Sequence, residues 1–159
     1  ARRELGYVAK NDLRALRRWS GYTFYPKNAI VLRFEPHYDA GFQYDYDGRI
    51  KEQWLAPKFY LQLKHQVSLS GGFLAVNNEN YYDVYHKNVH RGWMELNVNT
   101  SSKATGGAYL ELGKYIVRFE EPSYVGWGWI AEAWMTVKPL HNLVLENNYS
   151  YFELSKERS

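Results

Sequence analysis

Two histidines and a pair of glutamates are the side chains whose spacing first suggests chemistry. His86 and His90 stand four residues apart in "YHKNVH", and on a helix that spacing would present two zinc ligands on one face. The flanking residues are typical of a loop and a strand, and no third ligand follows nearby. Glu120 and Glu121 are adjacent, so a strand would point them to opposite faces. Neither pair predicts a metal centre or an acid-base dyad.

Signatures of nucleophilic and phosphate chemistry are also absent. The sequence contains no G-x-S-x-G elbow and no glycine-rich phosphate loop, and it has no cysteine to act as a thiol nucleophile. The doublets Gly71-Gly72 and Gly106-Gly107 instead indicate strand bending or room for a neighbouring aromatic ring. We therefore expect no catalytic residue, no metal and no cofactor, and a protein that is not an enzyme.

The segment "NNENYYDVYHKN", residues 77–88, is a candidate binding site of another kind. It is expected to be a loop, and it places Tyr81, Tyr82 and Tyr85 among asparagine side chains. Aromatic faces beside amides often grip sugars, which makes the three tyrosines a candidate sugar-binding loop. The alternative is that these rings only pack the loop and mark a membrane interface.

A basic run near the start of the chain has two interpretations. Its members are Lys10, Arg14, Arg17 and Arg18. They could meet lipid phosphates at a membrane surface. They could equally form a ladder with acidic residues of the next strand, because opposite charges on neighbouring strands support a sheet; the acidic partners would be Glu35, Asp39 and Asp45.

The elements that must position these residues are strands. In "AIVLRFEPHYDAGFQYDYDG", residues 29–48, apolar and polar residues alternate, and alternate side chains of a strand point to opposite faces. The stretch is longer than the roughly 3 to 10 residues usual in globular proteins. A long tilted strand of a barrel wall is the better interpretation.

The same period of two recurs along the chain, and no segment has a convincing helical period. We expect eight strands, over residues 12–25, 29–48, 53–63, 67–76, 91–100, 106–117, 128–137 and 143–152. The links alternate in length: "YPKN", "KHQ", "TSSKAT" and "KPLHN" are short, whereas "DYDGRIKE", "NNENYYDVYHKN" and "EEPSYVGW" are longer or more aromatic. Short turns at one end and long loops at the other are typical of bacterial outer-membrane barrels.

Alternation does not say which face points inward, because a small soluble barrel buries its apolar face and a membrane barrel turns it to lipid. Three features favour a membrane barrel whose apolar face contacts lipid. They are the charged groups on the polar face, the aromatic residues near strand ends and the strand lengths. The residues expected to face the lumen are Arg33, Glu35, His37, Asp39, Gln43, Lys58 and Gln62. The residues expected to face lipid are Ile30, Leu32, Phe34, Phe42, Phe59, Leu61, Leu63, Leu143 and Leu145.

The composition is consistent with strands that alternate apolar and polar residues. Aromatic residues make up 18% of the 159 residues, and no run approaches the length of about 20 apolar residues that a membrane helix needs. The net charge of +3 is spread along the chain, so a nucleic-acid partner is not indicated.

Several segments resemble one family. "GYVAKNDLRAL" resembles a strand-entry segment of the form G-[FY]-V-x-[KRN]-[NT]-D, here Gly6, Tyr7, Val8, Lys10, Asn11 and Asp12. "WSGYTFYPKN", a long strand ending "YDYDG", and "WIAEAWMTVKPLHNLVLENNYSY" continue the likeness over most of the chain. Together they resemble the C-terminal barrel region of a poorly characterised bacterial outer-membrane family. In that family a domain like carbohydrate-binding module family 9 precedes the barrel.

The resemblance implies a location in the bacterial outer membrane, with lipid as a partner and carbohydrate as a second candidate. The carbohydrate-binding domain and the last strands of the family pattern are not in this sequence, so residues 1–159 are expected to be one β-barrel segment truncated at both ends. We expect an all-β, antiparallel, up-and-down transmembrane β-barrel segment that completes its wall with other strands or subunits. It would form a pore, a transport channel or a scaffold for partner proteins. The alternative is a soluble β-barrel or sandwich that binds a hydrophobic or carbohydrate ligand.

Overall fold

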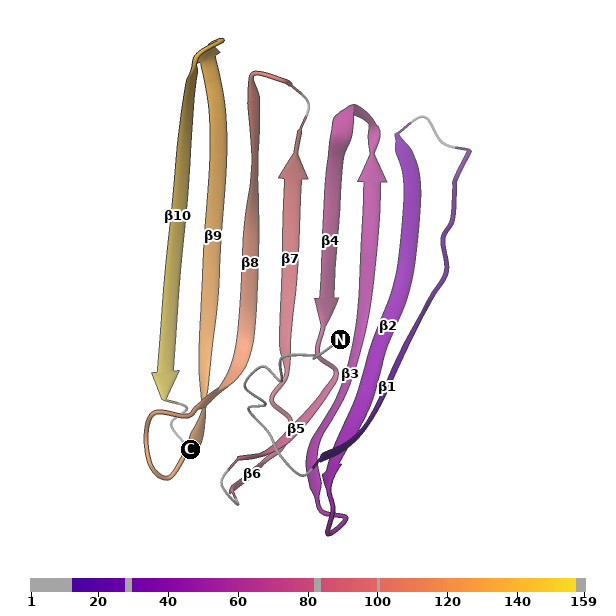
Figure 1. The fold of residues 1–159 in the computed structure, drawn as a ribbon, viewed down its shortest axis with the longest axis vertical. Coiled ribbons are helices and arrows are strands. Elements are labelled where there is room, and N and C mark those ends of the chain that lie inside the picture. The colour runs from indigo at the N-terminus through magenta and orange to yellow at the C-terminus, as the bar shows by residue number, and fades with distance from the viewer. Residues whose placement is uncertain (1–12, 28–29, 82–83, 100, 157–159) are drawn as a thin grey trace, which may run out of the picture.

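The chain folds as one antiparallel sheet. A computed structural model describes residues 13–27, 30–81, 84–99 and 101–156. The strands are β1 (Leu13–Gly21), β2 (Val31–Asp45), β3 (Ile50–Leu63), β4 (Val67–Phe73), β5 (Val76–Tyr81), β6 (Val84–His86), β7 (Arg91–Val98), β8 (Ala104–Val117), β9 (Tyr124–Leu140) and β10 (Leu143–Lys156). Eight of them lie side by side in the order β1-β2-β3-β4-β7-β8-β9-β10 (Figure 1). The predicted all-β, up-and-down antiparallel architecture is confirmed.

The sheet is open, whereas a barrel was predicted. β1 pairs with β2 and β10 pairs with β9, and the two edge strands lie at opposite sides of the sheet (Figure 1). A barrel closes only when its first and last strands exchange backbone hydrogen bonds. In the described residues β1 and β10 do not pair with each other, so this sheet forms a wall without closing it.

The links alternate between two ends of the sheet, although the β1–β2 link, residues 22–30, is longer than the turn predicted at residues 25–28. The β1–β2 and β7–β8 links, the 3₁₀ turn Lys64–Gln66 and the β9–β10 turn share one end, here called the turn end (Figure 1). The β2–β3 and β8–β9 links share the other, here called the loop end. The β2–β3 link is shorter than predicted, because β2 runs to Asp45 and β3 begins at Ile50. Asp45 closes this turn by accepting a hydrogen bond from the Arg49 N–H at 2.7 Å, and Gly48 supplies a positive φ of 80°.

The segment 77–88, predicted as a loop, contains β5 and β6. β3 is longer than β4: its residues 58–63 pair with β4, and its residues 52–55 pair with β5. On the edge of β3 that β4 does not reach, the backbone groups of residues 52–55 would otherwise lack hydrogen-bond partners. β5 pairs with these residues, and β6 then pairs with β5. The loop prediction was wrong here because it considered the segment without the strand beside it.

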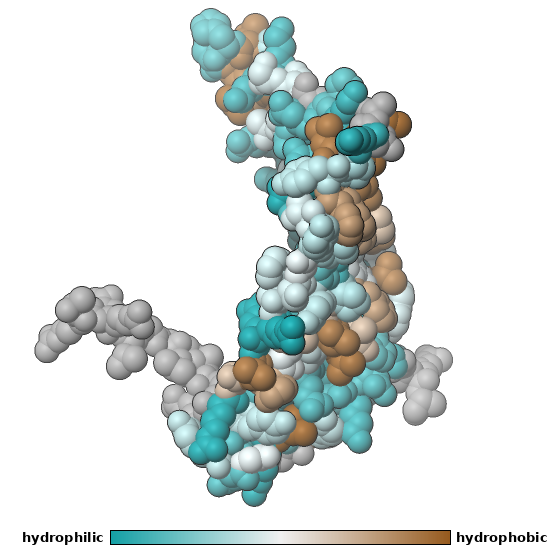
Figure 2. Space-filling model, turned by 90° about the vertical axis from the view of Figure 1, so that its right-hand side faces the viewer, coloured by the Kyte–Doolittle hydropathy of each residue, from teal (hydrophilic) through white to brown (hydrophobic). Residues whose placement is uncertain are grey.

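The two faces of the sheet have an unusual distribution of burial. The fully buried hydrophobic residues of the described chain are few: Ala56, Val89 and Val117. The buried polar or charged residues are more numerous: Asp39, Asp45, Asn77, Glu79 and His86. Seen from the side at which β1 lies, the sheet is curved and hydrophobic residues are exposed in patches along its length (Figure 2). Many large apolar side chains are therefore exposed, and the described residues contain no large apolar core.

Among the described residues, no helix has the length and apolar character that crossing a lipid bilayer requires.

Candidate functional site on the polar face

Cross-strand pairing places the predicted polar residues together. The pairs Arg33/Gln62, Glu35/Tyr60 and His37/Lys58 alternate with apolar pairs along β2 and β3. Directly paired residues point to the same side of a sheet. The seven residues predicted to face a lumen, Arg33, Glu35, His37, Asp39, Gln43, Lys58 and Gln62, thus share one face, here called the polar face.

The opposite side is here called the apolar face. Phe34 pairs with Leu61, Pro36 with Phe59 and Phe42 with Gln53, and the apolar rows continue through residues such as Leu69, Leu96, Ala108 and Ala133. The register shifts between Val31 and Arg33, so Val31 pairs with Leu63 and Leu32 lies at the irregularity. Ile30 lies beside Leu63 and Val67. Leu143 and Leu145 flank a second register shift and are 41% and 48% exposed.

β1 departs from this pattern. Arg14 pairs with Tyr44 and Arg18 with Ala40, so both arginines lie on the apolar side, on either side of Leu16. Arg14 lies over the Tyr46 ring, 5.1 Å from its centroid. Of the predicted basic run, Lys10 lies outside the described residues, and Arg17 alone of the three described members joins the predicted acidic ladder.

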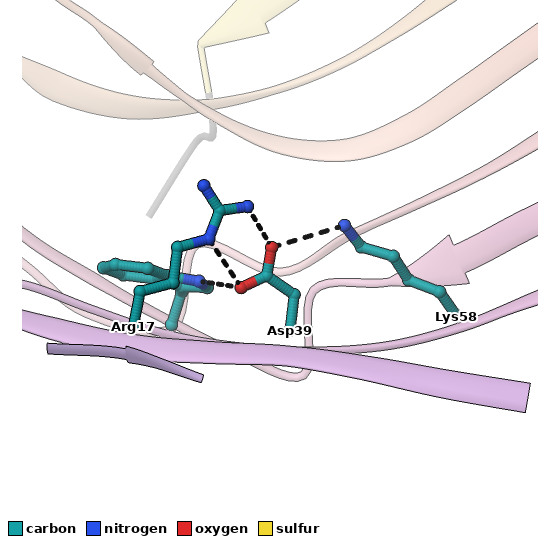
Figure 3. Close-up of polar contacts among 4 residues, drawn as sticks. Arg17, Asp39 and Lys58 are labelled. Carbon is teal, nitrogen blue, oxygen red and sulfur yellow. Dashed lines mark hydrogen bonds and ion pairs between the residues drawn. The ribbon is translucent and has the colours of Figure 1, made fainter. Parts of the chain in front are cut away.

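Asp39 is the centre of that ladder (Figure 3). Its side chain is 6% exposed and forms an ion pair with Arg17 of β1, whose Nε donates to Asp39 Oδ1 at 3.1 Å. The Trp54 indole N–H donates to the same oxygen at 3.2 Å. The Lys58 ammonium lies 3.8 Å from Asp39 Oδ2. Three strands are therefore connected through one carboxylate, which confirms the ladder at this position.

A second carboxylate, Glu111 of β8, organises the other half of the polar face. The Arg91 Nε lies 3.2 Å from Glu111 Oε1, and the Tyr115 hydroxyl donates to the same oxygen at 2.9 Å. The Tyr109 hydroxyl donates to Oε2. The Arg91 guanidinium also lies over the Tyr115 ring, 5.4 Å from its centroid. Charges on the polar face thus occur as hydrogen-bonded pairs.

Two contacts join the β5–β6 hairpin to the β8–β9 link at the loop end. The Arg118 guanidinium contacts Glu79 at 2.6 Å, and His86 Nε2 lies 2.9 Å from the Ser123 hydroxyl. Burial holds the pKa of the His86 imidazole below its ordinary value; Glu79 opposes this shift and Arg118 adds to it. His86 is 5% exposed, so its neutral form suits the site.

Tryptophan rings on the polar face lie against glycines of the preceding strand. Trp54 pairs with Gly41, Trp93 with Gly72 and Trp134 with Gly107. A Cβ on these glycines would lie 2.3, 2.5 and 2.4 Å from the respective rings, which shows that only glycine leaves room for them. The predicted role of Gly72 and Gly107 as space for an aromatic ring is confirmed.

Two hollows lie in the polar face and adjoin each other. One has a volume of about 530 Å³ and extends from Arg17 and Gln43 to Arg118. The other has a volume of about 260 Å³ and includes Lys58 and Trp93. Both are lined by Trp54, Leu74 and Arg91. We call the two together the polar groove.

The remaining candidates from the sequence are dispersed. Pairing of Asn80 with Tyr85 and of Tyr81 with Val84 puts Tyr81 and Tyr85 on opposite faces of the hairpin, and Tyr82 lies outside the described residues. His90 Nδ1 contacts the Leu74 carbonyl at 3.2 Å and does not share a partner with His86. Across the described ranges, no group of three His, Cys, Asp or Glu side chains could hold a metal.

Reasoning from the sequence missed Trp54, Arg91, Glu111 and Arg118 as members of the site. Trp54, Arg91 and Glu111 lie on the polar side of alternating strands, so their face was readable from the period of two, whereas Arg118 follows the end of β8 at Val117. The sequence did not reveal the pairing register, which decides the residue that each of them faces on the neighbouring strand.

Comparison of the chain with family models, with curated proteins and with solved structures found no match.

Proposed function

We propose that this chain is a wall segment of a bacterial outer-membrane β-barrel, with the apolar face against lipid and the polar face toward an aqueous interior. The observation that carries the proposal is the inverted burial of the sheet. Charged residues such as Asp39 and Glu79 are buried while large apolar residues such as Met94 and Leu110 are 51% and 43% exposed. A soluble barrel with an apolar core would bury the second kind.

The height of the apolar face supports the same proposal. Leu55 to Leu63 supply the apolar positions of β3 over nine residues, which extend about 30 Å along the strand. A tilt of about 40° reduces this to roughly 23 Å, close to the apolar band of about 25 Å in outer-membrane barrels.

Aromatic rings lie near both ends of the apolar face. Trp129 and Tyr151 are 4.8 Å apart toward the loop end, and the Trp129 indole donates to Glu153. Toward the turn end, Phe24 and Phe34 stack at 6.1 Å. Of these four rings, Trp129 and Tyr151 carry a polar group, which suits the boundary between lipid and water. The function proposed is passage of solutes or scaffolding, not catalysis.

Lipid does not tolerate unpaired backbone groups, so the proposal requires partners for the edges β1 and β10. Further β-strands, from the same polypeptide or from other subunits, would complete the wall. Each edge strand needs an antiparallel neighbour to continue the observed alternation.

The test uses single cysteines, since the chain has none of its own. Leu61 and Gln62 are adjacent in β3, lie on opposite faces, and pair with residues of both β2 and β4. Leu61 lies within regular pairing, whereas Leu32 lies at the register shift, so Leu61 is the better site on the apolar face. A dye at L61C quenched by a lipid-borne quencher, with no quenching at Q62C, supports the proposal. Quenching at neither site would mean that the apolar face packs against protein, as in the soluble alternative.

A further inference from the structure

We propose that the polar groove binds a neutral oligosaccharide, with Trp54 as the stacking surface and the arginines of the ion pairs as hydrogen-bond donors. This inference rests on the proposed function only in taking the polar face as the wet side of the sheet. It places sugar recognition on the inner surface of the wall, away from the tyrosines of the β5–β6 hairpin.

The first support is the Trp54 ring. It packs against Gly41, where a Cβ would lie 2.3 Å from the ring, and it is half-buried. It lines both hollows of the groove. Trp93 lines the smaller hollow, but the Lys58 ammonium lies over its ring, 5.6 Å from the centroid, so Trp54 is the stacking surface. A flat, fixed aromatic surface suits the C–H face of a sugar ring, since little conformational freedom is lost on binding.

The second support is the charge balance of the groove. Its cations are Arg17, Lys58, Arg91 and Arg118. Its carboxylates are Asp39, Glu52, Glu79 and Glu111. Four positive and four negative groups leave no net charge, so the groove does not select for an anion or a cation. This also disfavours nucleic acid, whose binding depends on an excess of positive charge.

The third support is the form in which these charges are presented. Arg17 contacts Asp39, Arg91 contacts Glu111 and Arg118 contacts Glu79. In each pair the arginine is the exposed partner: the arginine side chains are 70%, 36% and 49% exposed, and the carboxylates 6%, 14% and 11%. A guanidinium has five N–H donors, so the N–H groups that the carboxylate does not use can donate to ligand hydroxyls.

An unpartnered acceptor also lies at the groove. Gln43 lines the larger hollow, and its Oε1 is buried without a hydrogen-bond partner in the described part of the chain. A buried acceptor that lacks a donor costs free energy; rotation of the Gln43 amide toward the hollow would bring it to a ligand hydroxyl, which would supply that donor. The hollow of about 530 Å³ is within the size range of small-molecule sites.

The chain offers a matched control for the stacking role. Trp134 lies over Gly107 in the same way as Trp54 lies over Gly41, on the same face of the sheet, but it does not line either hollow. Replacing either ring by leucine removes the same kind of packing. Only Trp54→Leu removes a surface of the groove.

The experiment measures binding of maltotriose and cellotriose to the purified full chain in detergent, by calorimetry, with trigalacturonate as the charged counter-probe. We expect at least one neutral trisaccharide to bind more tightly than trigalacturonate. Trp54→Leu should weaken that binding about tenfold, the loss expected for an aromatic contact, whereas Trp134→Leu should leave it unchanged. Gly41→Ala, which displaces the Trp54 ring without removing it, should weaken binding as well.

The proposal is overturned if neither neutral trisaccharide binds, if trigalacturonate binds more tightly, or if Trp54→Leu and Trp134→Leu weaken binding equally. Lipid quenching at L61C, measured on the same preparation in vesicles, keeps this result separate from the proposed function. Quenching without saccharide binding would remove the groove proposal and leave the membrane wall.

Discussion

Placing an arginine at the middle of the apolar face tests the orientation of the whole sheet. Leu110 of β8 lies between Met94 and Ala131 on the neighbouring strands and is 43% exposed. Leu110 also lies in the middle of β8, about equally far from its ends at Ala104 and Val117. If this face contacts lipid, residue 110 lies near the centre of the bilayer.

The expected loss of folding free energy follows from that depth. An arginine on the lipid face of a barrel costs about 2–4 kcal/mol at the bilayer midplane and about 0–1 kcal/mol near the interfaces. Leu110→Arg should therefore reduce the folding equilibrium constant by roughly 30- to 1,000-fold. Leu140, the last residue of β9 at the turn end, is 60% exposed, and Leu140→Arg serves as the depth control.

The assay is urea-dependent folding into lipid vesicles, followed by the emission of the six tryptophans. Leu110→Met, which conserves volume, controls for the loss of leucine packing. On a water-exposed surface the arginine would change stability by less than about 0.5 kcal/mol. A Leu110→Arg value in that range, or one equal to that of Leu140→Arg, would refute the assignment of this face to lipid.

Three further variants probe the polar face and the loop end. Gly107→Ala should cost about 1–3 kcal/mol in urea unfolding, because the new Cβ overlaps the ring of the paired tryptophan; Gly92→Ala, whose nearest neighbour lies at 3.4 Å, should cost little. Asp39→Asn should destabilise the sheet by about 1 kcal/mol at low salt, and by less in 1 M salt, because the Arg17 partner is 70% exposed. The lowered pKa of His86 means that the folded state prefers the neutral ring. Its contribution to stability is present above the unfolded pKa of about 6.5 and is lost as pH falls through the lower folded pKa. The protection factors of the β6 amides, which correct for the slower intrinsic exchange at low pH, should decrease on acidification, and His86→Gln should abolish that pH dependence.

Much of the fold was predictable because the alternation of side chains along a strand shows which residues share a face. The alternation over residues 29–48 identified β2, and the same period identified the faces of β3, with Lys58 and Gln62 on one side and Phe59 and Leu61 on the other. Glycine doublets signalled the space that Trp93 and Trp134 occupy. These are properties of neighbouring residues in the chain, so they need no knowledge of which strands meet.

The candidate site was only partly predictable, because its contacts join residues that are distant in sequence. Arg118 and Glu79 are 39 positions apart, and His86 and Ser123 are 37 apart. A shift of one residue in pairing would reverse the face that a strand presents to its neighbour. Alternation within single strands does not specify that pairing.

The sequence by itself determined strands with one apolar and one polar face, since a period of two in side-chain character is sufficient for that, and the short links between strands favoured antiparallel pairing. The tertiary structure alone decided that β5 would pair with the exposed end of β3 and that Asp39 would join β1, β2 and β3. It also decided that the sheet remains open between β1 and β10. The physical reason is that hydrogen-bond register and edge pairing depend on both strands of a pair, and therefore on how the whole chain is arranged in space.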